Sequence, residues 1–75
     1  MENQIDNILV FATNIKTEND KQKIIEILDA NSEIHQWTID QEDIDCVLRI
    51  VSDTLSEEQI IELLNDQNFK CSILE

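Results

Sequence analysis

The apolar residues of the chain fall into short blocks that follow two different periods. Residues 8–11 are a continuous run of aliphatic and aromatic side chains, which is typical of a strand. Residues 34–39 and 44–50 alternate apolar and polar positions on either side of an acidic stretch, and this pattern predicts two strands joined as a hairpin. Residues 69–73 alternate in the same way. The pattern therefore predicts four strands.

Two further segments have the period of an amphipathic helix, and each begins with a capping sequence. Thr17 is followed by Asp20 and Ser56 is followed by Gln59, so both segments carry the residue types of a capping box. The first helix is expected to reach about residue 30. The second is expected to end before Asn68, a residue type that tolerates the left-handed backbone conformation. The positions expected to face the core are Ile24, Ile27, Leu28, Ile60, Leu63 and Leu64.

The order strand, helix, strand, strand, helix, strand predicts an α+β fold. In a chain of 75 residues it indicates a ferredoxin-like βαββαβ sandwich that forms one domain over residues 1–75. Right-handed crossovers give an antiparallel four-stranded sheet of order 4-1-3-2, with both helices on one face. Trp37, the single tryptophan, is expected at a core position of the second strand.

The side of the sheet opposite the helices is expected to be open. Alternation within the strands assigns Ile8, Val10 and Ala12 to one face of the first strand. The open side then receives Leu9, Phe11, Val47, Arg49 and Leu74, which form a candidate interaction face. An exposed apolar patch of this kind marks a contact surface, whereas apolar residues scattered singly over a surface are ordinary. Both interpretations stay open at this point.

Composition and charge exclude several functional classes. The chain has no Gly and no Pro, so it lacks the glycine-rich loops that bind nucleotide phosphates. It has 17 Asp and Glu residues against 5 Lys and Arg, a formal net charge of −12, and such a surface repels nucleic acid and anionic lipid. We expect a protein partner with a basic patch, or self-association, and neither a nucleic acid nor a membrane. The first residues lack a basic and an apolar leader region, which favours a cytoplasmic protein.

The residues that most often carry chemistry give no recognisable site in this sequence. Cys46 and Cys71 lie far apart, each within an expected strand, and both are expected to be reduced and buried. His35 is the only histidine and is expected in a surface loop. The acidic residues 40–45 superficially resemble a calcium loop. They lack its central Gly and its terminal bidentate Glu, so a solvated hairpin turn is the stronger interpretation. We expect no catalytic residues, no cofactor and no enzyme activity.

Three stretches carry a resemblance to a known family. Residues 14–20 read Asn-Ile-Lys-Thr-Glu-Asn-Asp after an apolar strand, Ile34, Trp37 and Ile39 mark the second strand, and residues 66–69 read Asp-Gln-Asn-Phe after the second helix. In these positions the chain resembles the heavy-metal-associated domain of copper chaperones and copper-pumping ATPases, whose first strand ends in Gly-Met-Thr-Cys-x-x-Cys. The resemblance covers residues 10–73 and implies a ferredoxin-like fold and docking to partner domains by charge complementarity.

The two metal-binding cysteines of that family are absent. Thr17 and Asp20 occupy their positions, and these are hard oxygen ligands, whereas Cu(I) prefers thiolates. The chain is similar to small bacterial proteins of this kind that lack the Cys-x-x-Cys motif. We expect a non-catalytic heavy-metal-associated-like protein with a degenerate metal site that serves as a protein-interaction or accessory module. One alternative is metal binding or transport through Thr17, Glu18 and Asp20 or a partner's thiols. Another is a small-ligand regulatory domain that dimerises through its sheet.

Overall fold

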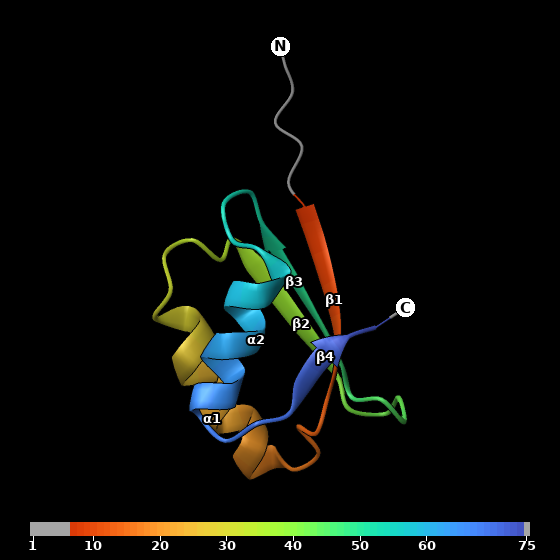
Figure 1. Ribbon diagram of the computed structural model, residues 1–75. Helices are drawn as coiled ribbons and strands as arrows, with labels where there is room; N and C mark the ends of the chain where they lie inside the picture. The colour runs from red at the N-terminus through yellow and green to blue at the C-terminus, as the bar shows by residue number, and fades with distance from the viewer. Residues whose placement is uncertain (1–6, 75) are drawn as a thin grey trace.

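The computed structural model describes residues 7–74 and has the expected α+β architecture (Figure 1). Its elements follow the order strand, helix, strand, strand, helix, strand. They are β1 (Asn7–Thr13), α1 (Glu18–Asp29), β2 (Gln36–Asp40), β3 (Val47–Ser52), α2 (Glu57–Asp66) and β4 (Cys71–Ile73). Met1–Asp6, on which the expectation about a leader rests, and Glu75 lie outside the described residues.

The four strands form one antiparallel sheet of order β2-β3-β1-β4. This is the expected order 4-1-3-2 counted from the opposite edge. β3 lies at the centre, where Leu9 on β1 and Trp37 on β2 both pair with Ile50. Both helices cover the same side of the sheet, so the ferredoxin-like α+β fold is confirmed (Figure 1).

Both helices begin at the predicted caps. The Thr17 hydroxyl accepts a hydrogen bond from the Asp20 N–H at 3.0 Å, and the Asp20 carboxylate accepts one from the Thr17 N–H at 3.3 Å. At α2 the Ser56 hydroxyl accepts from the Gln59 N–H at 3.2 Å, and the Gln59 side chain accepts from the Ser56 N–H at 2.8 Å. Each box satisfies amides that the first turn of a helix leaves without a partner. The helix starts could therefore be predicted to the residue.

Helix α2 ends in a Schellman motif in which an asparagine takes the place that glycine usually holds. Asn68 has a φ of 70°, in the left-handed region. Its N–H donates to the Asn65 carbonyl at 3.0 Å, and the Phe69 N–H donates to the Leu64 carbonyl at 3.0 Å. Phe69 and Leu64 both belong to the core cluster, so this turn also directs the chain into β4.

The core lies between the helices and the covered side of the sheet. Its helical residues are among those predicted, and Ile27, Leu63 and Trp37 pack against it while partly exposed. The buried core cluster consists of Phe11, Ile15, Ile24, Leu28, Leu48, Ile50, Ile60, Leu64 and Phe69. Burial of these side chains is the main source of stability for a domain of this size.

The predicted facing of β1 was wrong. Phe11 is fully buried and pairs with the core residue Leu48, and Leu9 packs against the core opposite Ile50. Ile8 instead lies on the open side and is 64% exposed. The strand is apolar at every position from 8 to 12, so its alternation carries no polar residues that would mark the solvent side.

The predicted start of β3 was also wrong. Ile44 and Cys46 were expected in the strand, but the strand begins at Val47 and both residues lie in the turn before it. Cys46 has a φ of 46° and is buried, whereas Ile44 is 90% exposed. Ile44 and Cys46 continue the apolar–polar alternation of the strand in the sequence, although the backbone joins the sheet only at Val47.

Candidate functional site

The loop between β1 and α1, where the family resemblance places a metal site, is closed by its own hydrogen bonds. Asp20 Oδ2 accepts from the backbone N–H groups of both Lys16 and Thr17, each at 3.3 Å. The hydrogen bond from the Lys16 N–H, together with the hydrogen bonds from Thr17, holds the pKa of the Asp20 carboxyl below its ordinary value. The Thr17 hydroxyl is bound to the Asp20 amide. Thr17 and Asp20, which stand where the resemblance would place two cysteines, therefore serve as helix caps.

A contact that the sequence did not predict ties this loop to the acidic turn. The Gln41 side-chain amide donates to the Ile15 carbonyl at 3.4 Å and to the Thr17 carbonyl at 3.0 Å. Ile15 is fully buried and anchors the loop in the core. Gln41 lies 24 residues from Thr17 along the chain, and no local pattern connects the two positions. The loop is therefore fixed from both sides.

The acidic turn, residues 40–46, has the hydrogen bonds of a tight hairpin connection. Asp40 Oδ1 accepts from the Glu42 N–H at 3.1 Å, and Asp43 Oδ1 accepts from the Asp45 N–H at 2.9 Å. Such side-chain to backbone bonds are the reason why Asp is common in turns. The turn joins two antiparallel strands, as the hairpin interpretation predicted. Its acidic side chains are exposed, and so is Ile44 near its end.

The two thiols do not form a shared site. Cys46 and Cys71 are both free cysteines, the first buried and the second half-buried at the start of β4. Burial raises the pKa of the Cys71 thiol to about 11, so it is protonated and weakly nucleophilic at neutral pH. Both thiols were predicted to be buried: Cys46 is buried as predicted, and Cys71 is less buried than expected. Within residues 7–74 no group of three or more His, Cys, Asp or Glu side chains is placed to hold a metal ion.

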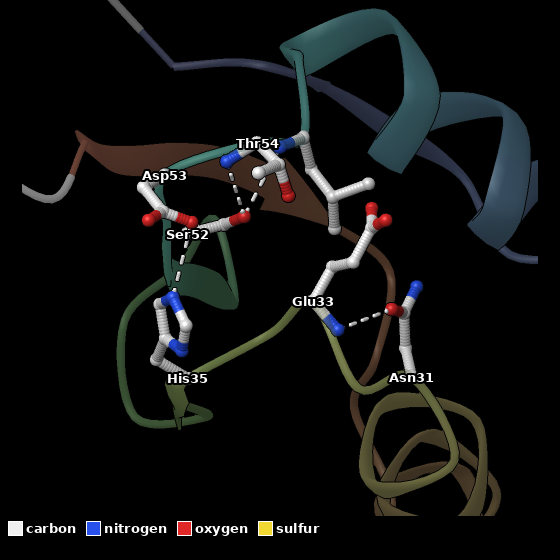
Figure 2. Close-up of polar contacts among 7 residues, drawn as sticks. Asn31, Glu33, His35, Ser52, Asp53 and Thr54 are labelled. Atoms are coloured by element: carbon white, nitrogen blue, oxygen red, sulfur yellow. Dashed lines mark hydrogen bonds and ion pairs between the residues drawn. The ribbon is translucent and has the colours of Figure 1, made fainter.

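One cluster has the composition, but not the geometry, of a nucleophilic triad. His35 Nε2 lies 3.1 Å from Asp53 Oδ1 in an exposed pair, as Figure 2 shows. Ser52 is fully buried, and its hydroxyl oxygen accepts from the backbone N–H groups of Thr54 and Leu55 at 3.2 and 3.1 Å (Figure 2). The hydroxyl is thus used to shape the turn into α2. A serine nucleophile must be exposed and bonded to its base, so this arrangement does not support hydrolysis.

The open face is the sheet surface that neither helix covers. We define it by the residues whose strand positions place their side chains on that side. They are Ile8, Val10 and Ala12 of β1, Gln36, Thr38 and Asp40 of β2, Val47, Arg49 and Val51 of β3, and Ser72 of β4. Leu74 continues it beside β1, because its N–H donates to the Val10 carbonyl at 3.1 Å. Of the five residues predicted for this face, Arg49 is exposed, Leu74 is partly buried and Val47 is buried. The remaining two, Leu9 and Phe11, face the core instead.

The open face has an apolar hollow beside its arginine. Ile8, Val51 and Gln36 form one row across three strands, and Val10, Arg49 and Thr38 form the next. A hollow of about 160 Å³ lies among Ile8, Arg49, Val51 and the residues 36–38. Exposed aliphatic side chains around a shallow depression, with a charged group beside it, are typical of a protein contact surface.

The comparisons with known proteins identify no relative of the chain. No family model, no curated protein and no solved structure matches it. The resemblance to the heavy-metal-associated domain therefore rests on the sequence pattern. Over residues 7–74, no helix has the length and apolar character that crossing a membrane requires.

Proposed function

We propose that the chain is a non-catalytic, cytoplasmic protein-interaction module of the heavy-metal-associated type, and that its acidic surface binds a partner protein with a basic patch. The observation that carries the proposal is the use of Thr17 and Asp20 as a closed helix cap at the position of the family's cysteines. Because Thr17 and Asp20 cap the helix, the loop keeps its shape without a bound ion. The proposal therefore assigns the function to the protein surface.

The acidic net charge of the chain supports a basic partner. The chain carries 17 acidic and 5 basic side chains, and its acidic turn presents several carboxylates between β2 and β3. A field of this size steers basic partners toward the molecule, and the attraction weakens as salt is added. A basic, partly apolar protein surface is therefore the class of partner that we propose.

The states of Ser52 and Cys71 in the described part of the chain support a role other than catalysis. The Ser52 hydroxyl is buried within its turn, and the pKa of the Cys71 thiol is raised. A hollow of about 410 Å³ beside Cys71 contains Lys70, Asn14 and Asn65 but no carboxylate or imidazole that would act as a base. His, Asp and Glu are the side chains that most often act as general acid or base within hydrogen-bonding reach of a substrate.

The test is the salt dependence of binding to a partner identified by crosslinking and then purified. We expect the affinity to fall at least about tenfold between low salt and about 0.5 M salt, because the charges lie on the surface. The triple variant Glu42→Gln, Asp43→Asn and Asp45→Asn removes three charges. It keeps an oxygen acceptor on residue 43 for the turn, and it should weaken binding at low salt only.

Two results would contradict this proposal. An affinity that does not change with ionic strength would remove the role of charge. Binding of Cu(I), Zn²⁺ or Ca²⁺ more tightly than millimolar in calorimetry would favour the alternative, in which the chain carries a metal through Thr17, Glu18 and Asp20 or with a partner's thiols.

A further inference from the structure

The open face differs in charge from the rest of the molecule. The described strand positions on this face include one cation, Arg49, and one carboxylate, Asp40, so the face is neutral in a chain whose net charge is −12. Both side chains are exposed, and no ion pair joins Arg49 to another residue within the described range 7–74. The face therefore has an apolar centre and two exposed charges of opposite sign, of which Asp40 also accepts a hydrogen bond from the Glu42 N–H.

We propose that the open face is a self-association surface, and that its occupant is the open face of a second copy of this chain. A strongly basic partner is expected to be drawn to the acidic parts of the surface, whereas a neutral apolar face attracts it least. A second copy presents the same neutral face, the same exposed Ile8 and a carboxylate for each arginine. In a two-fold dimer every contact occurs twice, so Arg49 of each copy has Asp40 of the other as the carboxylate on the facing surface.

The geometry of two packed sheets fits this surface. Sheets pack face to face at about 10 Å, a separation that aliphatic side chains fill and an arginine side chain spans. Ile8 is the most exposed aliphatic residue of the face, and it borders the hollow beside Arg49. Residues of one copy can thus fill the depression of the other, while the helices lie on the side of each sheet that faces away from the second copy (Figure 1).

The size of the face predicts a weak dimer. Four strands about 4.8 Å apart, with about six residues of about 3.3 Å each, cover roughly 400 Å² in projection. This is smaller than the surface of about 800 Å² that each partner buries in a standard stable interface. Two copies also repel each other through their net charges of −12. Association should therefore become stronger as salt screens that repulsion, which is opposite to the effect of salt on binding a basic partner.

The test is sedimentation equilibrium of the full chain from about 10 μM to about 1 mM, at about 0.02 M and about 0.5 M salt. We expect a monomer–dimer equilibrium whose association constant rises with salt. Ile8→Lys should lower that constant at least tenfold. Ile44→Lys is the matched control, because it makes the same change of charge at a residue that is 90% exposed and lies outside the open face. It should not lower the constant.

Charge reversal tests the proposed pair directly. Arg49→Asp and Asp40→Arg should each weaken the dimer severalfold, and the double variant should recover most of the loss. Thermal unfolding of each variant establishes that it is folded. Residues 8, 40 and 49 are all exposed, and Asp40→Arg is expected to lower the melting temperature slightly because it also removes the acceptor of the Glu42 N–H.

Several outcomes would overturn the proposal. A chain that stays monomeric at about 1 mM in high salt would contradict it, and so would an equal weakening of the dimer by Ile8→Lys and Ile44→Lys. A dimer that weakens as salt is added would also contradict it. If oligolysine, used as a basic probe, shifts the NMR signals of β1 and β3 while the chain stays monomeric, the face belongs to a basic partner instead. Added salt should strengthen the dimer but weaken the binding of a basic partner, so the failure of one proposal can be told from the failure of the other.

Discussion

A pair of substitutions in β1 tests which side of the strand faces the core. Phe11 is fully buried, so Phe11→Ala removes most of an aromatic side chain from the core and should cost about 3–5 kcal/mol of the free energy of unfolding. Ile8 is 64% exposed. About a third of its surface is buried, and scaling the roughly 1.5–3 kcal/mol for full burial gives about 0.5–1 kcal/mol for Ile8→Ala. The facing of β1 expected from the sequence, with Phe11 on the open side, predicts the opposite ranking, in which Ile8→Ala costs more than Phe11→Ala.

The assay is equilibrium unfolding in urea, with the midpoint and slope fitted for each variant. A domain of this length has a total stability of roughly 4–11 kcal/mol, so Phe11→Ala can leave it largely unfolded. Phe11→Leu is the milder variant, and its cost should fall within the range of about 0.5–3 kcal/mol that is common for single substitutions. If Ile8→Ala destabilises the chain as much as Phe11→Leu or more, the assignment of the two faces is refuted.

Three further predictions concern the helix ends and the half-buried thiol. Asp20→Asn should reduce the loss of stability in acid: the folded-state pKa of Asp20 is lowered, so its contribution is present above about pH 3.8 and disappears as the pH falls through the folded value. Unfolding curves between pH 2 and pH 6 measure this, and identical acid limbs for both proteins would contradict it. Asn68→Ala should cost about 1–2 kcal/mol because residue 68 has a positive φ, whereas Asn68→Gly should cost nothing; equal effects in urea unfolding would count against the motif. Cys71, with a pKa of about 11 against an ordinary value of 9.0, should react with iodoacetamide about 100-fold more slowly than an unfolded thiol at pH 8, and equal rates would exclude the raised pKa.

The helices and the strand order could be predicted because their signals are local. A capping box places its residues three positions apart, so Thr17 with Asp20 and Ser56 with Gln59 identify the first turn of each helix. Asn68 identifies the end of α2 in the same way, because Asn is one of the few side chains that adopt a positive φ at low cost. The order of the elements then leaves few possible topologies.

The errors occurred where the sequence pattern does not distinguish between two structures. Residues 8–12 are apolar on both faces of β1, so either facing fits the pattern. Ile44 and Cys46 extend the alternation of β3, and a positive φ at Cys46 has no sequence signal because cysteine has no preference for that conformation. The positive φ becomes understandable only in the fold, where the Cys46 carbonyl accepts a hydrogen bond from the Thr13 hydroxyl at 2.6 Å.

The candidate site was predicted in part. The residue types at positions 17 and 20 argued against soft-metal binding before their geometry was known, because hydroxyl and carboxylate groups are hard ligands. The contact of Gln41 with the Ile15 and Thr17 carbonyls joins segments that are distant in the sequence, and a single sequence gives no sign of it. The neutral open face likewise depends on the register between β1, β2 and β3.

A Cu(I) competition titration with a colorimetric chelator, performed anaerobically on the reduced chain, tests the central claim most directly. The claim is that side-chain oxygens close the loop before α1 by capping the helix, so that the loop has no site for a soft ion. The positive control is the double variant Thr17→Cys with Asp20→Cys, which places two thiols at these positions. We predict no binding tighter than millimolar for the natural sequence and tight binding for the control. Stoichiometric, tight Cu(I) binding by the natural sequence would contradict the account.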